Sequence, residues 1–422
     1  MDLVKLVVLA LVLGLTGAGL STAADAEPRP DDVRVWNELA LAAVRATRAS
    51  DADAARTYAI LNVAIYDAVN GLSDPARTHA LIPGPGPRNA DPSAATVAAA
   101  HAVLVRLDPD RTTTYDTQLG ADLAALPPGR HRDAGVRWGR EVGQRVVAAR
   151  TDDGSTPVQT QPAGTGPGVF RAEWSGVQYR NVRPFAAASP VAGPPPALTG
   201  LDYAAAFAEV ALLGDAAIPA PDKLATFQFW SVPTGTGQPA GEWVKIALTV
   251  SRDLPLPASA RLMALLTMTL ADTTIPTVAT KFTHRHWRPA TAIREADTDG
   301  NPLTQPNPTW APRAGSIGGT PEHPSGHSSY SGAAAAVLAG FFCADNTSFT
   351  HTTDTAPNGQ ARTYPSFSAA AAEAGRSRVF GGQHFEFSNQ AGLAIGRDVA
   401  TEVLATRLLK RTGPTHHGDC PL

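Results

Sequence analysis

Residues 281–294 read KFTHRHWRPATAIR, a stretch with three arginines, one lysine and two histidines in a chain that is only 17% charged. Lys281 and Arg288 are seven residues apart, or two turns of helix, so helical spacing predicts that they project from one side. Pro289 is expected to end or kink that helix and to leave Arg288 at its tip. The stretch can be read as an exposed basic helix end, as a metal site, or as a binding site for an anion.

The metal interpretation would use His284 and His286 as ligands. Residues at i and i+2 do not share a helix face, and no cysteine or carboxylate cluster adjoins them in the sequence. A zinc site is therefore disfavoured. The exposed helix end and the anion site both remain open at this point.

The composition of the whole chain is that of a globular protein. Its 422 residues are enough to bury a large core, and 43% of them are apolar. The formal net charge is −3, which offers no general attraction for nucleic acid or for an acidic membrane. Any anion binding must therefore be local.

The first 26 residues differ from the rest of the chain. A short head with Lys5 precedes the apolar run LVVLALVLGLTGAGL, and small residues follow up to Ala26. This order predicts a secretory signal peptide cut near Ala26–Glu27, and thus an exported, soluble mature protein that does not associate with a membrane. The alternative is a membrane anchor, for which the apolar run is short and rich in Gly and Thr.

Cysteine use agrees with export only weakly. Cys343 and Cys420 are the two cysteines of the chain. In an oxidising compartment they can form one disulfide that ties down the C-terminal tail. Two unpaired thiols fit the sequence almost as well.

Apolar residues recur at helical spacing along most of the chain, whereas alternating strand patterns are scarce. In ARTYAILNVAIYDAVNGL, for example, Tyr58, Leu61, Ile65 and Val69 share one face. We therefore predict an all-α protein built of helical bundles. The expected order is a signal peptide (1–26), an N-terminal helical region (27–151), an ordered loop rich in Pro and Gly (152–198) and a catalytic helical bundle (199–422).

Two local expectations accompany this order. The segment ASARLMALLTMTLADTTI is predicted to be a helix that begins after Pro257 and ends near Pro276, because proline disrupts a helix interior. The loop at 152–198 contains four aromatic residues, which favour an ordered segment wrapped on the protein over a free tether. These four are Phe170, Trp174, Tyr179 and Phe185.

A second motif, PEHPSGHSSYSG, occupies residues 321–332 and opens a run of small residues typical of a tightly packed helix. The first amides of a helix have no internal partner, and Gly326 lets the backbone approach a ligand closely, so this helix start can bind an anion. Ser325 adds a hydroxyl and His327 a titratable ring. The alternative is an ordinary helix start with Ser325 as its N-cap.

A third motif, SRVFGGQHFEFSNQAG, occupies residues 377–392 and places Arg378 six residues before His384. Taken alone, it is equally consistent with a glycine turn followed by a helix capped at Ser388 or Asn389. A lone histidine is more often structural than catalytic.

Together the three motifs favour the anion site. They hold cations, a hydroxyl and a helix amide, and we expect none of these donors to have a carboxylate partner within its own segment. Arginine matches oxyanions with a planar fork, and lysine adds a point charge. Two histidines supply acid–base chemistry. The set suits a tetrahedral oxyanion and consists of Lys281, Arg288, Ser325, Gly326, His327, Arg378 and His384.

The order of these motifs resembles the signature shared by type-2 phosphatidic-acid-phosphatase-like acid phosphatases and vanadium-dependent haloperoxidases. The signature is Lys, six residues, Arg-Pro; then Pro-Ser-Gly-His; then Ser-Arg, three residues, Gly, one residue, His. Upstream segments such as ILNVAIYDAVNG and HWRPATAIR are similar to the longer haloperoxidase branch. The resemblance thus implies a helical-bundle catalytic core that binds one vanadate per chain.

The resemblance also implies roles for single residues. His384 would be the axial vanadium ligand, and His327 the acid–base partner of the apical oxygen. Lys281 would polarise bound peroxide in addition to holding an oxygen. The equatorial oxygens would be held by Lys281, Arg288, Ser325, the Gly326 amide and Arg378.

Three positions depart from the family pattern. Val278 and Thr320 stand where aromatic residues or histidine are usual, on the side where the halide is presumed to approach. Ser388 stands where the family often has an aspartate that orients the axial histidine. Glu386 or a backbone carbonyl is expected to take over that orienting role.

The same donors also suit phosphate, so two alternatives stand beside the haloperoxidase. One is a secreted acid phosphatase in which His384 forms a phosphohistidine and His327 protonates the leaving group. The other is a non-catalytic oxyanion-binding protein. The expected partners are small molecules, namely hydrogen peroxide with a halide or a phosphate ester. The sequence predicts neither the halide nor the oligomeric state.

Overall fold

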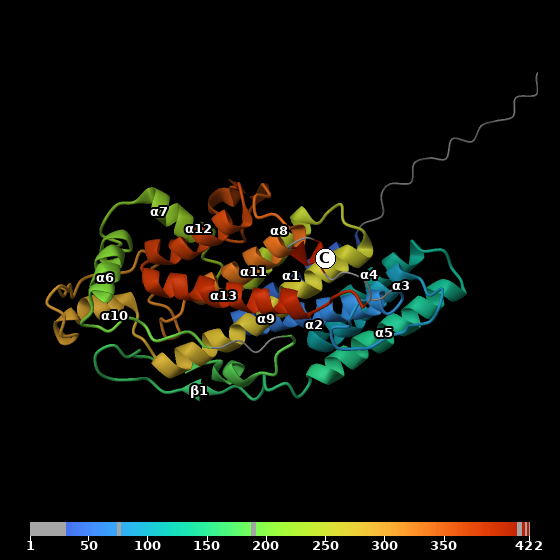
Figure 1. Ribbon diagram of the computed structural model, residues 1–422, viewed down its shortest axis with the longest axis horizontal. Helices are drawn as coiled ribbons and strands as arrows, with labels where there is room; N and C mark the ends of the chain where they lie inside the picture. Colours follow the sequence, from blue (N-terminus) through green and yellow to red (C-terminus); the bar gives the residue numbers. More distant parts are fainter. Residues whose placement is uncertain (1–30, 74–76, 187–190, 412–415, 418–419, 422) are drawn as a thin grey trace, which may run out of the picture. The chain divides into compact units, whose positions relative to one another are not determined.

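A computed structural model describes residues 31–73, 77–186, 191–411, 416–417 and 420–421. The expected signal peptide at 1–26 lies outside these residues. Residues 31–422 form one compact unit. The prediction of an all-α fold is confirmed, because α-helices make up nearly all the regular structure of the described residues (Figure 1).

Thirteen α-helices occur in the described part of the chain. In order they are α1 (Asp32–Thr47), α2 (Asp51–Asn70), α3 (Pro92–Leu107), α4 (Thr112–Ala124), α5 (Arg130–Arg150), α6 (Leu201–Leu213), α7 (Pro221–Phe229), α8 (Gln238–Val250), α9 (Leu256–His284), α10 (Pro289–Arg294), α11 (Gly326–Phe342), α12 (Phe367–Phe380) and α13 (Glu386–Thr406).

The strands are two or three residues long and pair antiparallel in three separate ribbons. They are β1 (Thr160–Gln161) with β2 (Trp174–Ser175), β3 (Phe349–His351) with β4 (Arg362–Tyr364), and β5 (His416–His417) with β6 (Cys420–Pro421). Short 3₁₀ turns are η1 (Pro109–Arg111), η2 (Val177–Asn181), η3 (Ala296–Thr298) and η4 (Pro357–Gly359).

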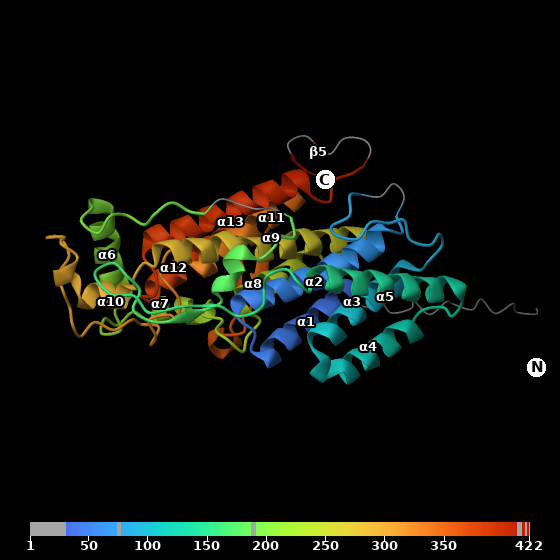
Figure 2. The same ribbon diagram turned by 90° about the horizontal axis from the view of Figure 1, so that it is seen from below.

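The core forms around α9, which packs against α2, α11 and α13. Side chains at helical spacing on α2 and α9 are buried in one continuous apolar cluster, including Tyr58, Leu61, Leu265 and Leu266. Figures 1 and 2 both show α6 and α10 at one end of this group of helices and α3, α4 and α5 at the other. The C-terminal end of α9 therefore points toward α10.

Helix α9 does not end near Pro276, so that prediction was wrong. The helix runs on to His284 with Pro276 inside it. Proline removes one backbone hydrogen bond, but the turns around it are buried, and threonine hydroxyls on both sides bond within the helix. Thr277 Oγ1 donates to Thr273 O at 2.8 Å, and Thr280 Oγ1 donates to Pro276 O at 2.7 Å. Tertiary packing thus outweighs local propensity.

By length and composition, α9 is the one described helix that is apolar enough to cross a membrane. However, 83% of its most apolar window is buried inside the protein, as in the core helix of a bundle.

The sequence places Lys281 and Arg288 two turns apart, but they do not share one helix. Helix α9 ends at His284, where Arg285 takes a left-handed conformation with φ of 50°, and Arg288 becomes the N-cap residue of α10. Pro289 therefore begins a helix rather than ending one, which suits its fixed φ at a first helical position.

The loop between α5 and α6 packs on the helices. The side chains of Phe170, Trp174, Tyr179 and Phe185 are all buried. Phe170 and Trp174 form a small apolar cluster with Val177, against which Val278 and Phe282 of α9 pack. This loop thus lies next to the end of α9 that carries Lys281.

Cys343, which ends α11, is disulfide-bonded. Its partner side chain lies outside the described residues.

Candidate active site

Lys281 lies in the last turn of α9 and is buried. Its Nζ donates to the carbonyl of Pro321 and, at 3.4 Å, to the carbonyl of Glu322. Burial, followed by repulsion from Arg288, holds the pKa of Lys281 well below its ordinary value. These bonds fix the ammonium group beside the segment that leads into α11.

Arg288 crosses from α10 to the other motifs. Its Nε donates to Thr320 O at 2.8 Å, and Nη1 donates to Gln383 O at 2.7 Å and to His384 Nε2 at 3.0 Å. Burial lowers the pKa of Arg288 to about 10. Gly318, with φ of +89°, is required beside it, because a Cβ there would lie 2.6 Å from Arg288 Cζ.

The start of α11 is a capped helix end that also borders a cavity. Ser325 is the N-cap, and its Oγ accepts from Ser328 N at 3.3 Å, so the capping alternative is confirmed. Gly326 and His327 follow as the first two helical residues and line a cavity. Ser325 is fully buried and is not among the residues that line this cavity.

His327 donates from Nε2 to Ser231 O at 3.2 Å. Burial, followed by the charge of Arg378, holds the pKa of His327 well below its ordinary value. The ring is therefore neutral at pH 7, with the proton on Nε2 and a lone pair on Nδ1.

Arg378 lies in the last turn of α12. Its Nη1 donates to Trp230 O at 3.5 Å, and Nη2 donates to Gln383 Oε1. Its Nε is buried without a hydrogen-bond partner among the described residues. Burial, followed by the charge of Arg288, lowers the pKa of Arg378 to about 9. One donor of this guanidinium is thus unsatisfied.

His384 lies between a cation and an anion. Its Nε2 accepts from Arg288, so the proton is on Nδ1, which donates to Glu322 Oε1 at 3.0 Å. Burial, followed by the charges of Arg288 and Lys281, holds the pKa of His384 well below its ordinary value. This arrangement fixes both the tautomer and the ring orientation.

Glu322 was missed in the sequence, because its partners come from the third motif and not from its own segment. Its side chain is 0% exposed. Oε1 also accepts from Phe385 N at 2.9 Å, and Oε2 accepts from Ser388 Oγ at 2.7 Å. Burial raises the pKa of Glu322 to about 7, against the hydrogen bond from Ser388 and the charge of Arg288.

The residue that orients His384 is therefore neither Glu386 nor a backbone carbonyl. Glu386 pairs instead with Arg376, at 2.6 Å between Oε2 and Nη1. Ser388, which replaces the expected aspartate, supports Glu322 and lies 2.9 Å from His323 Nδ1. A signal for Glu322 was present, since it is the one acidic residue between Pro321 and Gly332.

Six of the seven residues selected from the sequence line one cavity of about 540 Å³, namely Lys281, Arg288, Gly326, His327, Arg378 and His384. Ser50 and Asp51 from the start of α2 also line it, so the N-terminal part of the chain supplies a wall. We call the six lining residues together with Ser325 the oxyanion cradle. Behind it, Glu322 is the one carboxylate among the described residues that accepts a hydrogen bond from His384.

The cradle fits a tetrahedral oxyanion. Three buried cations face two carboxylates, Glu322 and Asp51, and burying unpaired charge is unfavourable without a counter-ion. Arg378 Nε lacks a partner, and the Gly326 position is open, because a Cβ there would meet only Asp51 Oδ2 at 3.8 Å. Vanadate and phosphate both meet these requirements.

The two positions that lack an aromatic residue have other contacts. Val278 lines a smaller chamber of about 80 Å³ with Trp174 and Lys281, so the loop supplies an aromatic side chain there. Thr320 binds Arg288 through its carbonyl at 2.8 Å and its hydroxyl at 3.3 Å. Thr320 therefore holds a cation of the cradle in place.

The chain resembles known proteins in both sequence and fold. A sequence model described as "VCPO second helical-bundle domain" matches residues 261–410. The fold is similar to that of a bacterial vanadium-dependent iodoperoxidase, with a TM-score of 0.77, 23% identity, and coverage of 91% of this chain and 98% of that one. No curated protein sequence matches the chain.

A bacterial vanadium-dependent chloroperoxidase in its holo form is also similar. The TM-score is 0.63 at 16% identity, over 84% of this chain and 92% of that one. All seven residues of the cradle lie within the matched range 261–410.

Proposed function

We propose that this chain, whose residues 261–410 belong to the VCPO second helical-bundle domain family and whose fold is that of vanadium haloperoxidases, is itself a vanadate-dependent haloperoxidase. It would oxidise halide with hydrogen peroxide to hypohalous acid. One observation carries the proposal. Three buried cations meet a histidine whose Nδ1 is bound to Glu322, which leaves Nε2 as a metal-ligating atom inside the cavity.

The cradle residues would divide the binding of vanadate among them. His384 Nε2 would be the ligating atom, with Arg288 donating to an oxygen in place of that nitrogen. Lys281, Arg288, Arg378 and the Gly326 amide donate to the remaining oxygens. Ser325 would join them by turning its hydroxyl proton from Ser328 Oγ to an oxygen, since the hydroxyl proton of Ser328 can stay on Asn389 Oδ1.

When bound, vanadate would supply a Lewis-acidic centre that activates hydrogen peroxide without a change of oxidation state. Lys281 polarises the oxygen to which it donates, because its buried ammonium group acts in a site of low dielectric constant. His327 takes up and returns protons at Nδ1, since Nε2 is held by Ser231 O. Glu322 keeps the ring of His384 in the ligating orientation.

The substrates are small molecules that reach the cradle through the cavity. Val278 and Trp174 line the chamber next to Lys281, and we propose that this side selects the halide. We further propose that the N-terminal 26 residues direct export, so that the enzyme acts outside the cell.

The proposal is tested by paired assays on the purified mature protein. One assay supplies orthovanadate and hydrogen peroxide with iodide, bromide or chloride and a halogen-accepting dione. The other supplies an aryl phosphate without vanadate. We expect the dione to be halogenated only when vanadate is present. The halides that support this reaction define the halide specificity of the enzyme.

Phosphate release that vanadate inhibits, without halogenation of any halide, would contradict the proposal and identify an acid phosphatase. Tight binding of vanadate with no turnover in either assay would also contradict it and identify an oxyanion-binding protein.

A further inference from the structure

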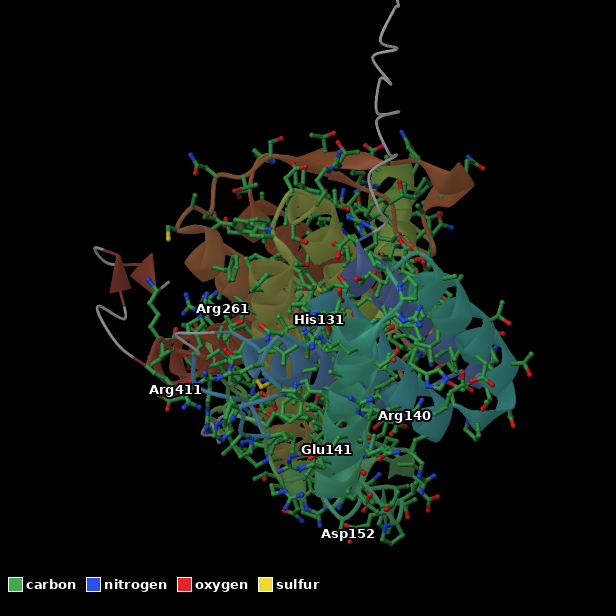
Figure 3. All side chains as sticks on the ribbon, turned by 90° about the vertical axis from the view of Figure 1, so that its right-hand side faces the viewer. His131, Arg140, Glu141, Asp152, Arg261 and Arg411 are labelled. Atoms are coloured by element: carbon green, nitrogen blue, oxygen red, sulfur yellow. The ribbon has the colours of Figure 1, made fainter. Side chains whose placement is uncertain are left out.

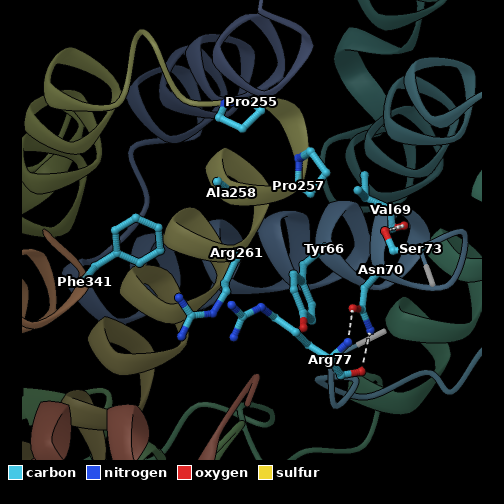
Figure 4. A pocket seen from close by; sticks show the side chains of 10 residues that line it. All are labelled: Tyr66, Val69, Asn70, Ser73, Arg77, Pro255, Pro257, Ala258, Arg261 and Phe341. Atoms are coloured by element: carbon cyan, nitrogen blue, oxygen red, sulfur yellow. Dashed lines mark hydrogen bonds between the residues drawn. The ribbon is translucent and has the colours of Figure 1, made fainter. Parts of the chain in front are cut away.

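A second cavity lies near the other end of α9, away from the cradle. Its volume is about 420 Å³, and its walls come from the end of α2, the start of α9 and the end of α11 (Figure 4). Apolar groups dominate these walls, among them Val69, Pro257 and the ring of Phe341. We call it the Arg261 pocket.

Arg261 is the charged residue on which this pocket depends. Its side chain is only 4% exposed, and its guanidinium lies over the Phe341 ring, 5.3 Å from the centroid. Nε donates to Leu408 O at 3.2 Å, whereas Nη2 is buried without a hydrogen-bond partner. A buried cationic donor without a partner is unfavourable, so an acceptor is required here.

A second arginine increases the positive charge. Figure 4 shows the Arg77 side chain extending across the pocket to lie beside that of Arg261. Arg77 Nη1 donates to the same Leu408 carbonyl, at 3.3 Å. Burial, followed by the charge of Arg77, lowers the pKa of Arg261 to about 10.

Within the described residues, no acidic side chain lines the pocket or pairs with Arg261. None of the ten residues that line the pocket is an aspartate or a glutamate, and no ion pair between described residues includes Arg261. In the end view of Figure 3, Arg411 lies on the same side of the molecule as Arg261, whereas Arg140 of α5 lies on the opposite side. The charge of Arg411 also acts on Tyr66 in the pocket wall.

This pocket is separate from the cradle. Arg261 and Lys281 stand 20 residues apart on the continuous helix α9, which corresponds to about 30 Å along its axis. The two cavities share no lining residue. A ligand here would therefore be neither the oxyanion of the cradle nor the halide.

We propose that the Arg261 pocket binds a small organic carboxylate with an apolar body, either aromatic or alkyl. The carboxylate would accept from Arg261 in the planar geometry that guanidinium groups favour. Phe341, Tyr66 and the prolines at the start of α9 would enclose the apolar body. This proposal does not depend on the function of the cradle.

Isothermal titration calorimetry of the full mature chain tests the proposal. The probes are benzoate for the aromatic class, hexanoate for the alkyl class, and inorganic phosphate as an anion without an apolar body. Arg261→Met removes the charge, and Ala258→Trp fills the pocket while Arg261 remains in place. Arg252→Met is the matched control, since Arg252 is an exposed arginine just before α9.

We expect Arg261→Met and Ala258→Trp each to weaken the binding of benzoate or hexanoate by about tenfold or more. Arg252→Met should leave it unchanged. Vanadate affinity should be the same in all three variants. If the thermal melt of Arg261→Met shows that this variant does not fold, the binding measured for Ala258→Trp alone tests the proposal.

Three results would overturn the inference. They are no binding of either organic acid by the unmodified chain, equal binding by Ala258→Trp, and inorganic phosphate binding at this pocket as tightly as benzoate.

Discussion

Two groups of charged side chains differ in their balance of charge. One is the oxyanion cradle. The other, which we call the Asp354 network, consists of Arg45, Glu242, Lys245, His351 and Asp354. In the cradle, three cations outnumber two carboxylates, Glu322 and Asp51, whereas the network pairs two basic residues with two acidic ones and a histidine.

The carboxylates of the Asp354 network are paired with donors of the protein. Asp354 accepts two hydrogen bonds from Arg45, at 2.7 and 2.8 Å, one from Lys245 at 3.0 Å and one from Gly237 N at 2.8 Å. Glu242 accepts from Lys245 at 2.8 Å and lies 2.9 Å from His351 Nε2. Each carboxylate therefore has cationic or amide donors within the protein.

The comparison shows which cluster needs a ligand. Charges that are balanced and bonded, as in the Asp354 network, hold the Gly237 backbone, which precedes Gln238 of the cavity wall, and contribute to folding. In the cradle, burial lowers the pKa values of all three cations, the charge of Arg288 adds to this for Lys281 and Arg378, and the excess positive charge favours an anion from outside. Changes in the cradle should thus affect ligand binding, and changes in the network should affect stability.

The largest effect is expected from His384→Ala. Because this change removes the ligating nitrogen, vanadate-dependent halogenation should fall by at least about 10³-fold. Steady-state kinetics and spectrophotometric titration with vanadate measure the two losses. His131→Ala, on the exposed part of α5, is the matched control and should behave like the unmodified protein. Halogenation that survives the loss of His384 would refute the ligand assignment.

Glu322→Gln should sharpen the comparison, because it should weaken the binding of one oxyanion, vanadate, without weakening that of another, phosphate. Vanadate should bind about 10- to 100-fold more weakly, since His384 loses the carboxylate that orients it and makes it a stronger ligand. Phosphate does not need to be ligated by His384 Nε2. It should bind to Glu322→Gln at least as tightly as to the unmodified protein, because the substitution removes a negative charge from beside the cradle. Competition titrations measure both constants. Equal weakening of both anions would contradict a positioning role for Glu322.

Asp354→Asn should reduce the free energy of unfolding by about 1–2 kcal/mol at pH 7, a value reduced because Arg45 is partly exposed. Burial alone would raise the pKa of Asp354, but bonds from Arg45, Gly237 and Lys245 outweigh it and hold the pKa well below its ordinary value. This stabilisation is fully present above the ordinary carboxyl pKa of about 4 and is lost as the pH falls below it.

Denaturant melts at pH 7 and at acidic pH measure this loss of stability. The difference in unfolding free energy between Asp354→Asn and the unmodified protein should be larger at pH 7 than at acidic pH. Asp253→Asn, at an exposed position, is the control. A difference that grows toward acidic pH would have the wrong sign for this network.

The smallest effect is expected from Thr320→Val. It removes the 3.3 Å hydroxyl bond to Arg288 but keeps the 2.8 Å carbonyl bond. One such bond contributes about 0.5–1 kcal/mol, so vanadate affinity should fall by less than about tenfold. Thr320→Ser retains the hydroxyl and should bind vanadate as tightly as the unmodified protein does. A loss as large as that of Glu322→Gln would mean that Thr320 supports more of the cradle than Arg288.

The sequence predicted the fold class and the residues that converge, because both follow from local patterns. Helical spacing is visible along α2 and α9. Glycine and serine before α11 mark a helix start, and isolated Arg and His residues stand out in a chain poor in charge. Six of the seven selected residues accordingly line one cavity.

The errors all concern effects over long sequence distances. Pro276 remains inside α9 because the surrounding helices bury both sides of it. Arg288 reaches His384 from a different helix, after a left-handed turn at Arg285. Glu322 bonds a histidine 62 residues away, whereas the nearer Glu386 is held by Arg376. Sequence proximity favours the wrong carboxylate, and only the packed structure identifies the right one.

The start of α2 and the loop after α5 both border the cavities beside Lys281. Ser50 and Asp51 come from the former and Trp174 from the latter, whereas every donor of the cradle follows residue 280. Mutations in the first half of the gene can therefore change which molecules enter without altering the groups that hold the oxyanion. Lineages that diverge there, or recombine there, would inherit one oxidising chemistry and differ in the compounds on which they use it.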